Sequence, residues 1–187
     1  MTNPIELPKE IWLEVISHLD YFDLKKCMRV SKEFKSFTEL PVCQETMFRS
    51  SKKLIPEGGA INLDNIQMHP AFDLMAFECA TKIEHVEFYT GKDYNGIVAL
   101  TDTCAAEEYA TDPPVAFIRL QIHSWPAVQV TNKSGVTVVQ VMKSLCRFFS
   151  KDDHRESMGD HTGWTGWDET KLDRKGRLLL RAMWFDS

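Results

Sequence analysis

Several acidic and imidazole side chains near the C-terminus could bind a metal ion. His154 and His161 lie close in sequence to Asp152, Asp153 and Asp160. A protein metal site needs three or four converging ligands, and this spacing matches no common ligand pattern. The segment is therefore more typical of a solvated acidic loop.

Nucleophilic catalysis has little support in the sequence. Cys104 and His123 could form a thiol–imidazole pair, but nothing marks either residue as activated, and the motif G-x-S-x-G is absent. His69 before Pro70 and His85 within an expected strand are most simply structural. No nucleotide-binding glycine motif occurs either. We therefore expect a protein that is not an enzyme and that needs no metal and no cofactor.

Two aromatic residues could instead serve recognition. Trp164 and Trp167 are three positions apart, so on a helical turn they would share one face. There they could form an exposed platform that binds a peptide or glycan of a target. Aromatic pairs at this spacing are more often buried anchors. Recognition surfaces often lie on long loops, so the predicted loops at residues 151–167 and 101–114 are candidates for the target-binding face.

Composition places these residues in a globular protein. The 187 residues are 43% hydrophobic and 26% charged, and the net charge is −5. Residues 1–55 contain nine Lys and Arg against eight Asp and Glu, whereas the remainder contains 13 against 19, a net charge of −6. Because no basic stripe emerges, we expect neither nucleic acid nor an anionic membrane as a partner.

The N-terminal sequence, the apolar runs and the cysteines predict the cellular compartment. The N-terminus lacks the cationic and apolar stretches of a secretory signal, and no apolar run approaches the roughly 18 residues of a membrane span. The five cysteines are odd in number and form no C-x-x-C pair, which favours buried thiols in a reducing environment. We expect a cytoplasmic or nuclear protein, or one present in both compartments.

The first 48 residues are predicted to form short helices. Pro8 suits a first helical position, Asp20 and Ser31 can cap the second and third helices, and Pro41 opens a fourth. The polar stretch 50–60 is rich in Pro and Gly and is the best boundary in the chain. The predicted organisation is a helical module at 1–49, a linker at 50–60 and a larger domain at 61–187.

The larger domain is predicted to be α+β, with an antiparallel sheet and at least one amphipathic helix. Thr137 and Gln140 form a capping box before an apolar stripe that reaches Phe149. Residues 118–122 and 128–131 alternate in polarity, which predicts a hairpin. Further strands are expected at 83–89, 97–100 and 177–185, and residues 151–167 are expected to form a polar loop.

The N-terminal segment contains more apolar residues than one small helical core needs, and exposed apolar patches mark partner sites. Its motif is Leu7-Pro8-Lys9-Glu10-Ile11-Trp12, then Val15-Ile16, Leu19, Asp23-Leu24, Cys27, Val30-Ser31-Lys32 and Phe34. This pattern resembles the F-box, most closely the fungal type, over about a quarter of the chain. Phe34 stands where the family often has Trp.

The resemblance implies binding to the Skp adaptor, which connects to cullin and RING subunits in an SCF ubiquitin ligase. The contact residues that it implies are Leu7, Pro8, Ile11, Ile16, Leu19, Leu24, Val30 and Phe34. The alternative is a helical cap that packs only on the protein's own larger domain.

The C-terminal part resembles an uncharacterised domain of mushroom-forming fungi over about residues 62–149. The matching segments are Met68–Phe72, Thr111–Pro114, Trp125–Pro126 with Val128 and Val130, and Gly135–Val138 with Val141. The usual aspartate after G-V-T-V is Gln140 here. That family carries no established activity that could be transferred.

Together these features predict a substrate-recruiting F-box subunit of an SCF ligase, which binds a target protein through its C-terminal domain and directs it to ubiquitin conjugation and proteasomal degradation. A second hypothesis is an adaptor-bound structural or regulatory protein outside ubiquitination. A third is a small-ligand binder or enzyme that uses the C-terminal domain.

Overall fold

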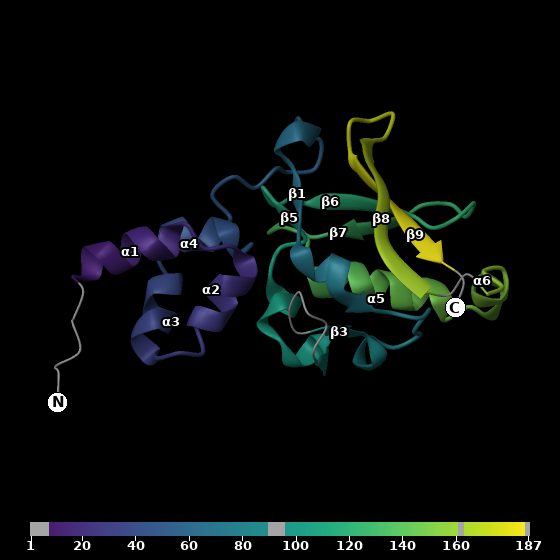
Figure 1. Cartoon of the computed structure of the whole chain (residues 1–187). Helices are drawn as coiled ribbons and strands as arrows, with labels where there is room; N and C mark the ends of the chain where they lie inside the picture. Colours follow the sequence, from purple (N-terminus) through teal and green to yellow (C-terminus); the bar gives the residue numbers. More distant parts are fainter. Residues whose placement is uncertain (1–7, 90–95, 161–162, 186–187) are drawn as a thin grey trace. The chain divides into compact units, whose positions relative to one another are not determined.

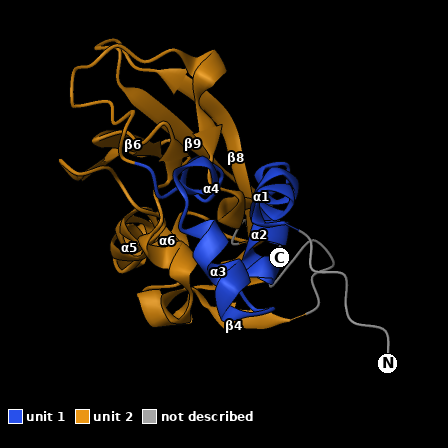
Figure 2. Cartoon of the chain, turned by 90° about the vertical axis from the view of Figure 1, so that its left-hand side faces the viewer, with its two compact units in different colours: residues 1–50 blue, residues 51–187 orange. Residues whose placement is uncertain are grey.

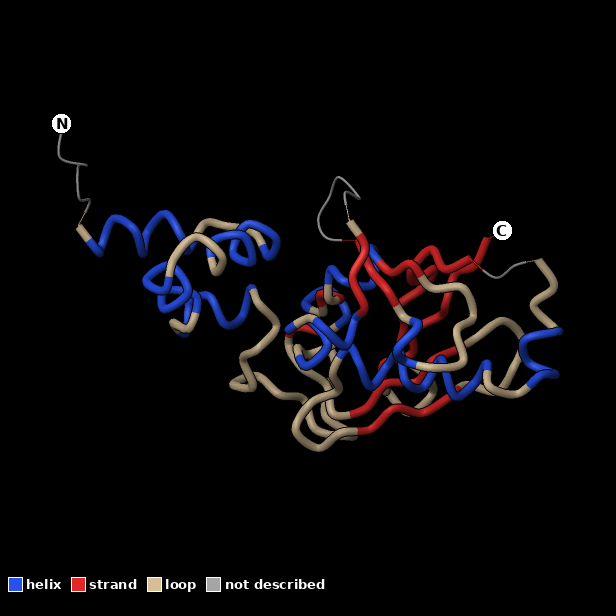
Figure 3. Tube along the Cα trace, turned by 90° about the horizontal axis from the view of Figure 1, so that it is seen from below, coloured by secondary structure: helices blue, strands red, loops and turns tan. Residues whose placement is uncertain are grey.

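The computed structural model of the chain describes residues 8–89, 96–160 and 163–185. It divides into two compact units, Met1–Ser50 and Ser51–Ser187, which Figure 2 colours separately. Among the described residues, the first unit contains only helices and loops, and all strands belong to the second (Figure 3). No helix in the described parts of the chain has the length and apolar character needed to cross a membrane.

The first unit consists of four short helices: α1 (Lys9–Ser17), α2 (Tyr21–Cys27), α3 (Lys32–Thr38) and α4 (Pro41–Thr46). The predicted caps are confirmed. The Asp20 carboxylate accepts the backbone N–H of Asp23 at 2.9 Å, and the Ser31 hydroxyl accepts that of Phe34 at 3.2 Å. Such short helices are marginal alone, so tertiary packing must hold them.

A small apolar core within the first unit provides that packing. Its fully buried members are Ile16, Leu24, Phe37, Cys43 and Met47. Trp12 and Phe34 pack against this core, and their two rings contact each other edge to face with centroids 5.0 Å apart. Each helix contributes to this core, which explains why the segment folds into one body.

The second unit is organised around a four-stranded sheet and one long helix. The strand order is β7 (Val128–Thr131), β6 (Phe117–Gln121), β9 (Leu178–Phe185) and β8 (Gly163–Leu172). The predicted hairpin of β6 and β7 is confirmed, whereas β6 and β9 pair in parallel and so make the sheet mixed. The helix α5 (Val138–Phe149) shares one core with the sheet, and Figure 1 shows it running alongside the strands.

Short 3₁₀ helices connect the remaining elements, which are two small antiparallel sheets and one short α-helix. The sheets and the α-helix are formed by β1 (Gln67–Met68) with β5 (Thr111–Asp112), by β2 (Met75–Ala76) with β3 (Glu87–Tyr89) and β4 (Ile97–Ala99), and by α6 (Asp152–Glu156). The predicted linker is partly ordered, because Ile55 exchanges backbone hydrogen bonds with Pro114 and Ala116.

The backbone before α5 requires a glycine at position 135, which belongs to the segment Gly135–Val138. Gly135 has φ +105°, and a Cβ there would lie 2.6 Å from the ring of Tyr109. The chain then enters α5, where the Gln140 side chain accepts the backbone N–H of Thr137 at 3.1 Å. Any other residue at 135 would clash with Tyr109 and strain the backbone.

Two predictions for the second unit are wrong. Residues 151–167 are not a polar loop, because they contain α6 and the beginning of β8. The strand predicted at 83–89 begins as a 3₁₀ helix, Ile83–His85, so His85 does not lie in a strand. In β8, register shifts at Trp164–Gly166 and at Trp167–Glu169 interrupt the alternation that normally reveals a strand.

Candidate functional site

Apolar side chains that the first unit leaves on its surface form the first candidate site. Ile11, Val15, Val30 and Val42 are 45–68% exposed, although the unit already has a core of its own. Ile11 and Val15 are four residues apart on α1 and therefore lie on one face of that helix. Such a surface can bind a partner by burying apolar area.

The predicted adaptor-contact residues divide by burial. Pro8, Ile11 and Val30 are exposed, Leu19 and Phe34 are half-buried against the core, and Leu7 lies outside the described residues. Ile16 and Leu24 are only 1% exposed within the unit's own core. In this conformation they can position the helices but cannot touch a partner. Val15 and Val42 are exposed apolar residues that the predicted set omits.

Trp164 and Trp167 form no exposed platform, and that interpretation is wrong. Trp164 is buried, and its indole N–H donates to the carbonyl of Phe72 at 2.8 Å. Trp167 is half-buried and packs edge to face on Phe72, with centroids 5.3 Å apart. Both residues belong to the strand β8 and not to a helical turn, so they anchor the core of the second unit.

Two cysteine thiols of the second unit, Cys79 and Cys146, are buried. Burial raises the pKa of the Cys79 thiol to about 12 and that of Cys146 to about 11, so both remain protonated at neutral pH. Cys104 and His123 are exposed. Among the described residues, no group of three or more His, Cys, Asp and Glu could hold a metal ion, and His161 lies outside them.

A buried imidazole–carboxylate pair lies in the second unit. His69 Nε2 and Glu108 Oε2 are 3.2 Å apart, and both side chains are fully buried. His69 Nδ1 accepts the backbone N–H of Ala71 at 3.0 Å, so the ring proton resides on Nε2 and points at the carboxylate. His69 is therefore structural, as its position before Pro70 predicts.

One hollow of about 490 Å³ lies between β7 and α5. Trp125, Phe148 and His154 line it, and the His154 ring lies 4.1 Å from each of the other two rings. His154 Nδ1 is 2.9 Å from the carbonyl of Phe148, and the Trp125 indole donates to Ser157. The three rings thus pack on one another in the lining of the hollow.

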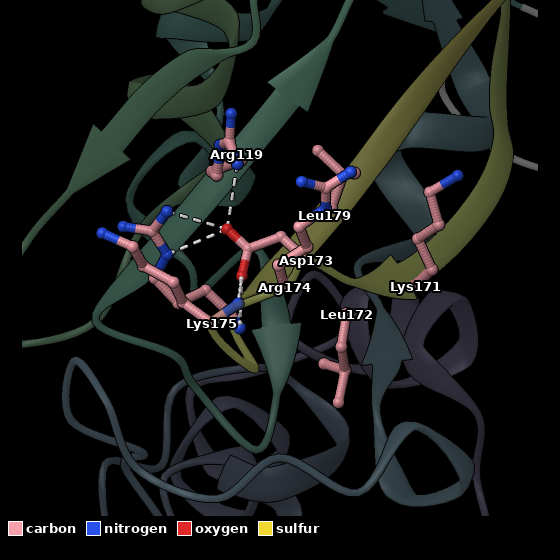
Figure 4. A pocket seen from close by; sticks show the side chains of 8 residues that line it. Arg119, Lys171, Leu172, Asp173, Arg174, Lys175 and Leu179 are labelled. Carbon is pink, nitrogen blue, oxygen red and sulfur yellow. Dashed lines mark hydrogen bonds and ion pairs between the residues drawn. The ribbon is translucent and has the colours of Figure 1, made fainter.

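A second hollow, of about 440 Å³, lies where β8 turns into β9. Its centre is Asp173, whose Oδ2 accepts hydrogen bonds from Arg119 Nη1 at 3.0 Å and from Arg177 Nη2 at 2.8 Å (Figure 4). The Oδ1 atom accepts the backbone N–H groups of Lys175 and Arg177. The carboxylate thus joins β6 to the β8–β9 turn.

These donors stabilise the charged form of Asp173. Hydrogen bonds from the Arg177 side chain lower the pKa most. The backbone N–H groups of Arg177 and Lys175 and the Arg119 guanidinium lower it further, and together these donors outweigh the opposite effect of burial. They hold the pKa of the Asp173 carboxyl well below its ordinary value.

This shift predicts a pH-dependent stability. A carboxyl whose pKa is lower in the folded state stabilises the fold above the unfolded-state pKa of about 3.9, and this contribution fades as the pH falls through the folded-state pKa. Asp173→Asn should therefore destabilise the chain at about pH 7, and its difference from the wild type should shrink below about pH 4. Denaturant unfolding at several pH values measures this difference. A difference that stays constant with pH would contradict the assignment.

Comparison with known families covers both units. The F-box domain matches residues 5–43, and a family of unknown function, DUF6699, matches residues 73–183. The second match begins after Phe72, so it omits the segment Met68–Phe72 of the sequence resemblance, and it continues past residue 149 to include Asp173 and the turn around it. No curated protein and no solved structure matches the chain.

Proposed function

Because the chain belongs to the DUF6699 family of unknown function and carries an F-box domain, we propose that it recruits target proteins to an SCF-type ubiquitin ligase. The F-box unit binds the Skp adaptor and, through it, the cullin and RING subunits. The DUF6699 domain binds the target. The chain itself performs no chemistry.

One observation carries the first half of this proposal. A four-helix unit with a complete core of its own still exposes Ile11, Val15, Val30 and Val42. Burying apolar surface contributes about 25 cal/mol per Å², which must exceed the entropic cost of association. A few residues near the centre of such an interface contribute most of the binding energy.

The proposed activity is a proximity effect. A target bound to the second unit has its lysines held near the ubiquitin-charged enzyme at a high effective concentration. The ubiquitinated target then goes to the proteasome, and the chain acts in the cytoplasm or the nucleus. No group on the recruiting subunit needs to be catalytic.

Binding to purified Skp adaptor tests the proposal. Size-exclusion chromatography of the full-length chain mixed with the adaptor should give one complex at micromolar concentration, which corresponds to a binding free energy of about −8 kcal/mol or better. Separate elution of the two proteins would contradict the proposal.

Reconstitution with cullin and RING subunits tests its second half. Proteins crosslinked to the chain in its native cell extract should acquire ubiquitin in that mixture. A stable complex that modifies none of them would favour the alternative of an adaptor-bound structural or regulatory protein.

A further inference from the structure

The hollow at the β8–β9 turn has an unusual charge for this protein. Its lining comprises five cations, one acid and two leucines: Arg119, Lys171, Arg174, Lys175, Arg177, Asp173, Leu172 and Leu179. Residues 56–187 as a whole have 13 Lys and Arg against 19 Asp and Glu. Cations are therefore concentrated at this one position of an otherwise acidic unit.

Acids compensate only part of this charge, because Lys171 Nζ is paired with Glu169 Oε2 at 2.7 Å and Asp173 is the one acid in the lining. Asp173 already accepts hydrogen bonds from Arg119, Arg177 and the turn backbone, so one carboxylate faces two guanidinium groups. Arg174 and Lys175 are exposed and form no ion pair among the described residues. The Nε of Arg119 is buried without a hydrogen-bond partner in that same part of the chain. The hollow thus retains a positive charge that a ligand can balance.

Two features fix the geometry of these cations. Asp173 ties Arg119 on β6 to Arg177 on the turn (Figure 4). The Arg177 guanidinium also lies 4.6 Å from the centroid of the Phe117 ring. Pre-ordered side chains lose less entropy on binding. Arg177 Nε and Nη2 and Arg119 Nη1 already donate to Asp173, and the remaining guanidinium N–H groups can donate to a further carboxylate.

The apolar part of the lining restricts the chemistry of the ligand. Leu172 and Leu179 are half-buried and leave aliphatic surface inside the hollow. A ligand that matches both the cations and the aliphatic surface carries carboxylates together with an aliphatic side chain. A long polyanion such as RNA is disfavoured, because residues 56–187 carry a net negative charge that repels it.

We propose that this hollow is a docking site for a short acidic segment of a target protein, with its carboxylates on Arg174, Lys175 and the two clamped arginines and an aliphatic residue on Leu172 and Leu179. The inference rests on the proposed function in one respect, since it names the class of target that the second unit presents to the ligase.

The test measures fluorescence anisotropy of the full-length chain with a labelled mixture of short peptides made of Asp, Glu and Leu. The expected result is salt-dependent binding that the double variant Arg174→Glu/Lys175→Glu weakens by at least about tenfold, because attraction becomes repulsion. The matched control, Lys133→Glu/Lys143→Glu, reverses two exposed lysines of the same unit that do not line the hollow, and it should bind like the wild type.

Three results would overturn the inference: no binding of the peptides, equal weakening by both double variants, or tighter binding of single-stranded RNA than of the peptides. Adaptor binding measured on the same samples separates the two proposals. If Arg174→Glu/Lys175→Glu binds the Skp adaptor normally and the wild type binds no acidic peptide, the inference fails while the proposed function stands. If the wild type binds the peptides but not the adaptor, the proposed function fails while the acidic-peptide site stands.

Discussion

Replacing Ile11 and Val15 together with glutamate is expected to weaken binding of the Skp adaptor by at least about a hundredfold, because carboxylates would enter an apolar interface unpaired. The two side chains are 48% and 45% exposed and take no part in the core of the first unit. The free energy of unfolding should therefore change by no more than about 0.5 kcal/mol. Titration calorimetry with the adaptor and denaturant unfolding measure the two quantities.

A matched control uses the second unit, where Ile97 and Met183 are also exposed apolar residues. Ile97→Glu/Met183→Glu makes the same change of charge and should bind the adaptor like the wild type. Ile16→Glu supplies the contrasting case, because it buries a carboxylate in the first unit's core and should abolish binding by unfolding the helices. Normal binding by Ile11→Glu/Val15→Glu would show that this face of α1 is not the docking surface.

The first helix illustrates how far periodicity alone can be taken. Its stripe of Ile11, Trp12, Val15 and Ile16 is typical of an amphipathic helix, and the helix ends at Ser17, before Leu19. It does not indicate which part of the stripe faces the unit's own core, because two apolar surfaces lie side by side on the helix. Ile16 enters that core, whereas Ile11 and Val15 are exposed. Only the packing of the other three helices decides between them.

Elements with simple local signals were predictable in the second unit, and those that depend on tertiary context were not. The hairpin of β6 and β7 and the start of α5 follow from alternation and from the Gln140 cap. The strand β8 was missed because register shifts beside Trp164 and Trp167 disrupt its two-residue period. Burial of these tryptophans depends on Phe72, which lies some 90 positions earlier in the chain and cannot be inferred from local sequence.

The cationic hollow was missed for a related reason. Arg119 and Asp173 are 54 positions apart and meet only because β6 pairs with β9. The net charge of the second unit is negative, which hides a local excess of cations. The one available signal was the density of charge in Asp173-Arg174-Lys175-Gly176-Arg177, a pattern more often found in a solvated turn.

The buried pair of His69 and Glu108 leads to the second large expected effect. Glu108 follows a 3₁₀ turn, and its backbone carbonyl accepts the N–H of Val138 at the start of α5. Two residues later, the Ala110 carbonyl accepts the N–H of His69, and the Ala110 N–H donates to Val136. The side-chain pair therefore joins two segments whose backbones already meet, and it fixes the entry into the main helix.

Replacing His69 with alanine should lower the free energy of unfolding of the second unit by about 3 to 5 kcal/mol, because it removes the imidazole donor from a buried carboxylate and leaves a cavity. Glu108→Gln keeps the size and one acceptor, so it should cost only about 1 kcal/mol. Tryptophan fluorescence during denaturant unfolding follows this unit, since four of the five tryptophans belong to it.

A double-mutant cycle of His69→Ala with Glu108→Ala should give a coupling energy of at least about 1.5 kcal/mol. A coupling energy near zero would mean that the two side chains stabilise the fold independently, and the entry into α5 would then depend on the backbone hydrogen bonds of residues 108–110 alone.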